Sequence, residues 1–179
     1  INATQGWDIT TGDIGDPNRA HSVVVAVVDS GVSPTHPDLI ERLTPGYNAI
    51  DGTDNTADIG GHGTHVAGTA AAETNNGMGI AGVSWGARLM TVKVLDQDGD
   101  GWYFDIAAGI VYAADNGAQI INLSLGGSSP SQLLQDAVDY AHAKGSLLVA
   151  ASGNNGGAVY YPGACQNVLT VAATDAQDN

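Results

Sequence analysis

The sequence contains a single cysteine, Cys165, and only five lysine and arginine residues among its 179 residues. One cysteine cannot form an internal disulfide bond, so the chain is not a disulfide-stabilised scaffold. The five basic residues stand against 19 acidic ones, which gives a formal net charge of −14 at pH 7. Nucleic acids and anionic lipid surfaces are bound through basic patches, so this charge balance argues against both as partners.

Long apolar runs are also missing. No stretch reaches the roughly 18 apolar residues that a membrane-spanning helix needs, so we expect no membrane partner. No basic segment followed by an apolar one opens the chain, and we expect any signal peptide to be absent or already removed. The apolar fraction of 43% is large enough for a sizeable core, and the length fits one domain or a large part of one.

The acidic residues are mostly aspartate, with 17 Asp and only two Glu, Glu41 and Glu73. Aspartate suits loops, helix caps and the binding of hard cations, whereas glutamate suits exposed helix faces. A solvated acidic surface that keeps the protein soluble accounts for the same composition. Composition alone leaves both interpretations open.

Short apolar runs alternate with helical patterns along the chain. Ser22–Asp29 is apolar at successive positions, which is typical of a strand buried on both faces of a parallel sheet. The same character recurs in Leu89–Leu95, Gln119–Leu123, Leu147–Ala151 and Val168–Ala173. Helices are predicted for His62–Ala72, Tyr103–Asn116 and Leu133–Lys144, the last after a capping box that runs from Ser129 to Gln132 with Pro130 at the first helical position. This order predicts an α/β fold, a three-layer αβα arrangement with a mostly parallel sheet.

Polar clusters follow several of the predicted strands. Asp29 ends the first strand, Asn154 follows a later one, and His62 opens a predicted helix after a long acidic loop. Carboxyl ends of parallel strands meet at one edge of a sheet, so we expect these side chains to gather there. An Asp, a His and an amide donor are three parts of an acyl-transfer site that lacks its nucleophile. Taken singly, each also fits a cap, a core residue or a turn, and His62 with His65 lacks the spacing and further ligands of a zinc site.

The segments Val27–Val32 (VVDSGV), Gly61–Gly68 (GHGTHVAG) and Ala151–Gly156 (ASGNNG) resemble the Asp, His and oxyanion-Asn motifs of subtilisin-like serine proteases, the thermitase-like members above all. Asn122–Gly127 (NLSLGG) resembles the substrate-binding strand of the same family. The resemblance covers essentially the whole chain. It implies a subtilisin-like fold, with residues 1–179 as the N-terminal part of a single catalytic domain of a secreted, extracellular serine endopeptidase.

The resemblance also implies roles for the catalytic residues. Asp29 would orient His62 and stabilise its protonated form, and His62 would act first as general base and then as general acid. Asn154 would stabilise the oxyanion of the tetrahedral intermediate.

Substrate-binding roles are implied in the same way. The backbone of Ser124, Leu125 and Gly126 would pair with an extended peptide. The implied wall of the primary side-chain pocket comprises Ala151, Ser152 and Gly153. Tyr160 would lie at the bottom of that pocket, before a cis Tyr161–Pro162 bond, and Asp100 would lie on the rim of the cleft.

One departure from the family pattern bears on activity. The chain contains no Gly-Thr-Ser-Met-Ala motif, and the family places its nucleophilic serine downstream of the position of Asn179. We therefore expect this chain alone to be inactive, with a C-terminal remainder of the protease as the partner that supplies the serine. Peptide substrates, and a propeptide or proteinaceous inhibitor, are the other expected partners. The alternative is a non-catalytic, subtilase-like binding module that has lost the serine.

The resemblance further implies structural calcium. In the loop that begins at Thr74, the carbonyl groups of Thr74, Met78 and Ile80 and the side chain of Asn76 would bind the ion, together with the carboxylate of Asp38. Oxygen-only ligands suit calcium rather than zinc. An ordinary glycine-rich turn is the alternative.

A second calcium site is expected in the loop that precedes His62. Thermitase-like enzymes bind calcium in the corresponding loop, and here the carboxylates come from Asp51, Asp54 and Asp58. A solvated acidic loop explains these residues equally well. The segment Asp96–Gly101 mimics the first half of an EF-hand loop, but Ala107 stands where the bidentate Glu belongs, which excludes an EF-hand.

Overall fold

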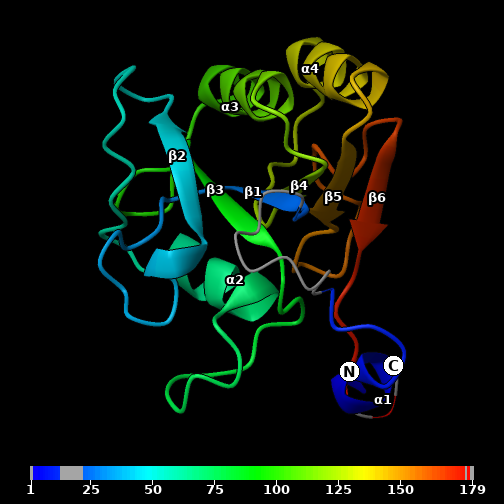
Figure 1. Ribbon diagram of the computed structural model, residues 1–179. Helices are drawn as coiled ribbons and strands as arrows, with labels where there is room; N and C mark the ends of the chain where they lie inside the picture. Colours follow the sequence, from blue (N-terminus) through cyan, green and yellow to red (C-terminus); the bar gives the residue numbers. More distant parts are fainter. Residues whose placement is uncertain (1, 13–21, 176, 178–179) are drawn as a thin grey trace.

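The computed structural model describes residues 2–12, 22–175 and 177. In chain order its elements are α1 (Ala3–Trp7), β1 (Val24–Asp29), a 3₁₀ helix (Ile40–Arg42), β2 (Leu43–Asn48), α2 (His62–Ala71), β3 (Arg88–Lys93), α3 (Tyr103–Asp115), β4 (Ile120–Leu123), α4 (Gln132–Ala143), β5 (Leu147–Ala151) and β6 (Val168–Val171). The strands form one six-stranded sheet in the order β2-β3-β1-β4-β5-β6, and every pair in it is parallel. Helices α3 and α4 cover one face of the sheet and α2 lies against the other (Figure 1). The three-layer α/β fold predicted from the sequence is confirmed.

Strand β1 lies in the middle of the sheet, between β3 and β4. Side chains alternate between the two faces of a strand. Accordingly Ala26 and Val28 pack in the core on the α3 and α4 side, whereas Val25 and Val27 pack in the core on the α2 side. Burial on both faces explains why this segment is apolar at every position rather than at every second one.

Strand β2 was not predicted, because Pro45 and Gly46 within it are signals against a strand. The structure accommodates them at the edge of the sheet, where β2 pairs with β3 alone. The register of this pair shifts between Thr44 and Tyr47. An edge strand needs ladder hydrogen bonds on one side only, so the missing N–H of proline is tolerated there.

The predicted capping box of α4 is wrong, although the helix itself is present. Ser131 is the N-cap, and its hydroxyl accepts a hydrogen bond from the backbone N–H of Leu134 at 3.3 Å. Pro130 therefore precedes the cap instead of occupying the first helical position. Ser131 is favoured as the cap because it stands three residues before Leu134, whose N–H lies in the first turn and has no partner within the helix.

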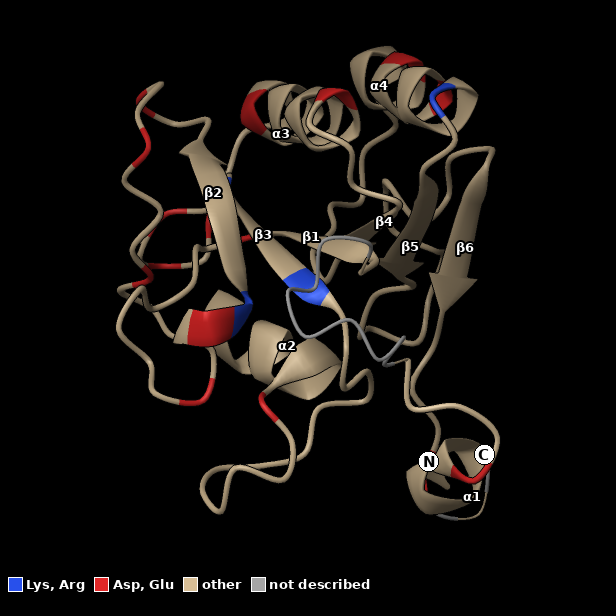
Figure 2. Cartoon of the chain, viewed as in Figure 1, with Lys and Arg blue, Asp and Glu red and all other residues tan. Residues whose placement is uncertain are grey.

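Charge is distributed unevenly between surface and interior. Figure 2 shows that most of the acidic residues stand in loops and on helices rather than in the strands of the sheet. Among the described residues, two basic side chains, Arg42 and Lys93, and two acidic ones, Asp29 and Asp38, are buried, so burial leaves the net charge of the surface strongly negative. In the part of the chain that the structure describes, no helix combines the length and the apolar character needed to cross a membrane.

Candidate active site

Asp29 and His62 form a hydrogen-bonded pair at the carboxyl end of β1. Asp29 is the last residue of β1 and is fully buried, with 0% exposure. His62 is the first residue of α2, and its Nδ1 lies 2.7 Å from Oδ1 of Asp29. The His62 side chain is 56% exposed, so one edge of the imidazole is held by a buried carboxylate while the ring remains accessible from solvent.

The carboxylate of Asp29 is only partly satisfied by the protein. Besides His62, Oδ1 accepts a hydrogen bond from the backbone N–H of Ser30 at 2.7 Å. Oδ2 is buried and has no hydrogen-bond partner among the described residues. The described residues therefore leave one oxygen of this buried carboxylate without a hydrogen bond.

Glycine at position 63 allows α2 to begin so close to β1. A Cβ atom at Gly63 would overlap the carbonyl oxygen of Gly31 and lie 3.1 Å from the Cβ of Asp29. Any larger residue would push the start of α2, and His62 with it, away from the strand end. The Asp29–His62 hydrogen bond therefore depends on this glycine.

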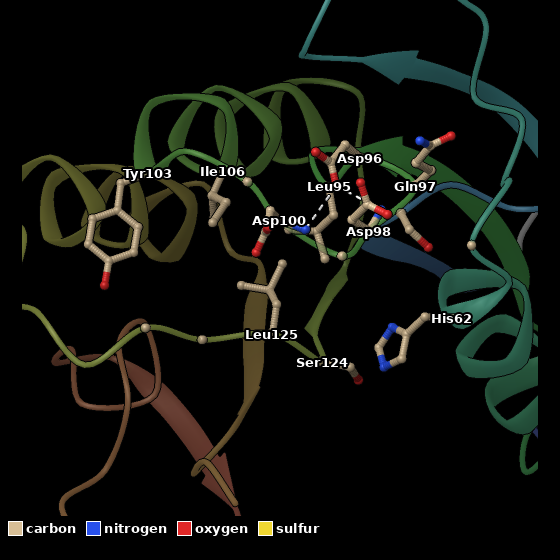
Figure 3. Close-up of a pocket in the computed structure, with 16 residues that line it drawn as sticks. His62, Leu95, Asp96, Gln97, Asp98, Asp100, Tyr103, Ile106, Ser124 and Leu125 are labelled. Atoms are coloured by element: carbon tan, nitrogen blue, oxygen red, sulfur yellow. Dashed lines mark hydrogen bonds between the residues drawn. The ribbon is translucent and has the colours of Figure 1, made fainter.

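A cleft opens beside His62. Figure 3 shows His62 at one end, the loop that carries Asp96 and Asp100 along one side, and Ser124 and Leu125 along the other. The side of the cleft formed by residues 124–127 is held in place at Gly127. The N–H and C=O of Gly127 both form hydrogen bonds with the backbone of Tyr161, at 2.9 and 2.8 Å. The structure thus brings the predicted substrate-binding residues Ser124, Leu125, Gly126 and Asp100 into one cleft with His62.

Tyr160 packs between the two segments predicted to bind substrate. Its backbone N–H bonds to the carbonyl of Ser152 at 3.0 Å. A Cβ atom at Gly153 would lie 3.1 Å from Cγ of Tyr160, and one at Gly126 would lie 3.0 Å from its Cβ. The Tyr160 ring is therefore in contact with Gly153, beside Ala151 and Ser152. The Tyr161–Pro162 bond is cis, as the sequence resemblance predicted.

Asn154 lies in the exposed loop that follows β5. The carboxyl end of β5 is at the same edge of the sheet as that of β1, since all the strands are parallel. Within the described residues the amide of Asn154 takes part in no hydrogen bond and does not line the cleft with His62. The amide is thus at the expected edge, with its donor N–H groups free.

The loop from Thr74 to Ala81 folds around the carboxylate of Asp38, which is 2% exposed. Its Oδ1 accepts a hydrogen bond from the side-chain amide of Asn76 at 2.7 Å, and its Oδ2 accepts one from the N–H of Ile80 at 3.0 Å. Gly79 has a φ of 62°, and a Cβ there would overlap the Asp38 carboxylate. A buried carboxylate, an amide and loop carbonyls, including those of Thr74 and Met78, are oxygen donors that fit calcium.

The three carboxylates of the predicted second calcium site are not brought together. Oδ1 of Asp51 accepts hydrogen bonds from the N–H and hydroxyl of Thr53, at 3.0 and 2.7 Å, while Asp58 faces the start of α2. Across the residues described, no group of three His, Cys, Asp or Glu side chains, Asp54 included, is arranged to hold a metal ion. The second site stays a prediction.

Lys93 is a residue of the site that was not predicted from the sequence. It ends β3 opposite Asp29 in the sheet register, is buried, and donates hydrogen bonds to the carbonyl groups of Ser30 and Leu95, the latter at 3.0 Å. It therefore fixes the backbone directly after Asp29. No signal in the sequence reveals this role, because it depends on which strands are neighbours.

Comparisons with known proteins show the family to which the chain is similar. The sequence profile of the Subtilase family (Peptidase_S8) matches residues 20–179. The chain is 47% identical over 173 residues to a thermophilic serine proteinase of Bacillus sp. (strain AK1), covering 96% of this chain and 41% of that protein. It is 46% identical over 180 residues to thermitase of Thermoactinomyces vulgaris, covering 100% and 62%. It is also 46% identical over 156 residues to the minor extracellular protease Epr of Bacillus subtilis (strain 168), covering 86% and 24%.

Solved structures have a similar fold. A protease from Pseudoalteromonas arctica PAMC 21717 superimposes with a TM-score of 0.85 at 37% identity, covering 97% of this chain and 60% of that one. Sphericase superimposes with a TM-score of 0.80 at 43% identity, covering 85% and 53%. The chain spans between 41% and 62% of the length of the first two relatives. By its sequence and its fold, this chain belongs to the subtilase family of serine proteases.

Proposed function

We propose that the protein to which residues 1–179 belong is a secreted serine endopeptidase, and that these residues form the N-terminal part of its catalytic domain. The observation that carries the proposal is the Asp29–His62 hydrogen bond of 2.7 Å at the end of a cleft, in a chain of the subtilase family. The relative named as an extracellular protease supports secretion.

The proposed mechanism follows from the geometry of this pair. Asp29 holds the Nδ1–H of His62, which leaves Nε2 to take the proton of a serine hydroxyl as that oxygen attacks the substrate carbonyl. The imidazolium that forms is stabilised by the buried carboxylate and then protonates the leaving amine. The amide of Asn154 donates to the oxyanion of the tetrahedral intermediate.

The nucleophile is proposed to come from a segment beyond Asn179, since no serine of this chain stands in a Gly-Thr-Ser-Met-Ala motif. Ser124 lines the cleft, but its hydroxyl accepts a hydrogen bond from the side-chain amide of Asn122 at 2.9 Å. The isolated chain is accordingly proposed to be inactive. Peptide hydrolysis would then require the remainder of the protease, which supplies the serine.

The proposed substrate is an extended peptide that lies between Ser124–Gly127 and the loop 95–101, as an added strand. Asp96, Asp98 and Asp100 border this cleft, and their negative field favours basic residues upstream of the cleaved bond. A propeptide or a proteinaceous inhibitor would occupy the same cleft.

Labelling with a serine-directed phosphonyl fluoride tests the proposed function. In the full-length protein we expect one label per molecule, on a serine outside residues 1–179, with complete loss of peptide hydrolysis. A binding module that has lost the serine would bind peptides, would not be labelled and would not hydrolyse them. That second result would rule out the protease.

We also propose that calcium binds between Asp38 and the loop 74–81, where its chemistry would be purely structural. When bound, the ion would replace the hydrogen bonds that now join Asp38 to Asn76 and Ile80. The start of this loop is anchored by an ion pair of 2.8 Å between Glu73 and the buried Arg42.

Removing calcium from the full-length protein with a chelator should lower its Tm. A ligand at 100 times its Kd stabilises the folded state by about 2.7 kcal/mol, which corresponds to a fall of about 5–10 °C for a domain of this size. Differential scanning calorimetry measures the shift. The Asp38→Asn variant should respond much less to chelator, and an unchanged Tm in the wild-type protein would contradict the proposal.

Tyr160 is predicted to restrict the primary pocket to small side chains. With its ring against Gly153 and Gly126, we expect cleavage after Ala to exceed cleavage after Phe or Leu. Tyr160→Gly should raise kcat/KM for Phe relative to Ala by about tenfold or more, the scale of adding a methylene or more to an apolar pocket. A peptide-library profile measures both, and equal or better cleavage after Phe in the wild type would contradict the prediction.

A further inference from the structure

Asp58 lies four residues before His62 and accepts four hydrogen bonds. Its Oδ1 accepts one from the hydroxyl of Ser30 at 2.9 Å and one from the N–H of Gly61 at 2.9 Å. Its Oδ2 accepts one from the N–H of Thr64 at 2.9 Å and one from the hydroxyl of Thr64 at 2.6 Å. These bonds use all the acceptor positions of a carboxylate. Burial acts to raise the pKa of Asp58, but the hydrogen bonds from Thr64, Gly61 and Ser30 outweigh it and hold the pKa below its usual value.

The partners of Asp58 are the chain neighbours of the catalytic pair. Ser30 directly follows Asp29, and its N–H donates to the Asp29 carboxylate at 2.7 Å. The same Ser30 accepts, through its hydroxyl, a hydrogen bond from the N–H of Gly63 at 2.9 Å. Gly61 and Gly63 flank His62 on either side. One network therefore connects the backbone on both sides of His62 to the residue that follows Asp29.

His62 itself has little other support. Its side chain is 56% exposed, so packing alone does not fix the ring. The N-cap position of α2 is Gly61, which has no side chain to cap the helix. Asp58 supplies this cap from outside the helix by accepting from the N–H of Thr64, where a negative charge is also favoured by the helix dipole.

We propose that Asp58 is a positioning residue for the Asp29–His62 pair, one that fixes the first turn of α2 to the end of β1. This inference rests on the proposed function and adds to it a residue that does not touch the substrate. Its effect is on the geometry of proton transfer, where a misplacement of about 1 Å can lower the rate by about 10²-fold. A positioning role also explains why a carboxylate stands at position 58 without requiring that it bind a metal ion.

Asp58→Asn in the full-length enzyme tests the proposal, because it preserves the shape of the side chain and replaces one acceptor oxygen by a donor. We expect kcat to fall on the order of 10-fold to 100-fold, with KM within about twofold of wild type. Rates are expressed per active site, counted by titration with a phosphonyl fluoride. A purely structural role would lower the number of titrated sites and leave kcat per site unchanged, which would overturn the proposal.

Asp136→Asn is the matched control, an identical charge change on the exposed surface of α4, where among the described residues the carboxylate accepts a hydrogen bond from Gln132 alone. It should retain wild-type kcat. Ser30→Ala gives a milder second variant, since it deletes only the hydroxyl that joins Asp58 to Gly63. Because both changes act on one network, the double variant should lose less than the product of the two single losses. Independent losses would overturn the proposal.

Two further readouts do not depend on turnover. The proton shared by His62 and Asp29 should give a downfield NMR signal in the wild type that shifts or broadens in Asp58→Asn. Loss of one bound calcium ion in Asp58→Asn, with an unchanged NMR signal, would instead make Asp58 a metal ligand and overturn the proposal. If the wild-type protein cannot be titrated at all, the proposed protease function fails, which is a different result from a failure of the Asp58 assignment.

Discussion

Replacing Asp29 by Asn in the full-length protein should lower kcat by about 10⁴-fold and leave the fold intact. Asparagine has nearly the same shape, but its amide can donate to Nδ1 of His62. The imidazole then carries its proton on Nε2, the nitrogen that must accept the proton of the serine. The variant also loses the buried negative charge that stabilises the imidazolium. Wild-type Asp29 provides both effects from a fully buried position 2.7 Å from the ring.

Steady-state kinetics on a peptide substrate measure this loss, and circular dichroism checks the fold. Adding His62→Ala to Asp29→Asn should cost little more than the larger single loss, because residues that act as a unit are strongly non-additive. Asp136→Asn again serves as the charge-matched control. A loss of less than tenfold in Asp29→Asn would contradict the assignment of this pair as the catalytic base and its partner.

Replacing Asn154 by Ala should lower kcat by about 10²–10³-fold with little change in KM. A side-chain amide that donates to the oxyanion acts in the transition state more than in the ground state, so its loss appears in kcat. In the present structure this amide is exposed and donates to no other group in the part of the chain that the structure describes, which leaves it available for the oxyanion.

Asn155→Ala is the matched control, since Asn155 is the neighbouring exposed amide and, among the residues described, its side chain bonds only to the N–H of Gly157, at 3.3 Å. It should keep wild-type kcat. A loss in Asn154→Ala that is confined to KM would mean that the amide binds substrate and transition state equally. That outcome would remove Asn154 from the oxyanion site.

The alternation of apolar runs and helical patterns was sufficient to predict the fold class. Residues of β1 are apolar on both faces, and such a run has few stable positions other than the middle of a covered parallel sheet. Strand β2 was not predicted because Pro45 and Gly46 weaken the sequence pattern of a strand. A strand tolerates these residues only at the edge of the sheet, where β2 lies. The cap of α4 was predicted at Ser129 but is Ser131. Several serines stand close together here, and only the backbone geometry selects the one that caps the helix.

By itself, the sequence determined the family, the parallel α/β architecture and the identity of Asp29, His62 and Asn154 as candidates, because these depend on local patterns and on motifs in a fixed order. Only the tertiary structure decided what surrounds each carboxylate. Asp58 reads in sequence as a calcium ligand or a solvated acid, whereas in the fold its oxygens accept hydrogen bonds from Ser30, Gly61 and Thr64. The sequence shows where a carboxylate stands but not which groups donate hydrogen bonds to it. For Asp58 these donors come from the end of a strand and the start of a helix, which meet only when the sheet is assembled.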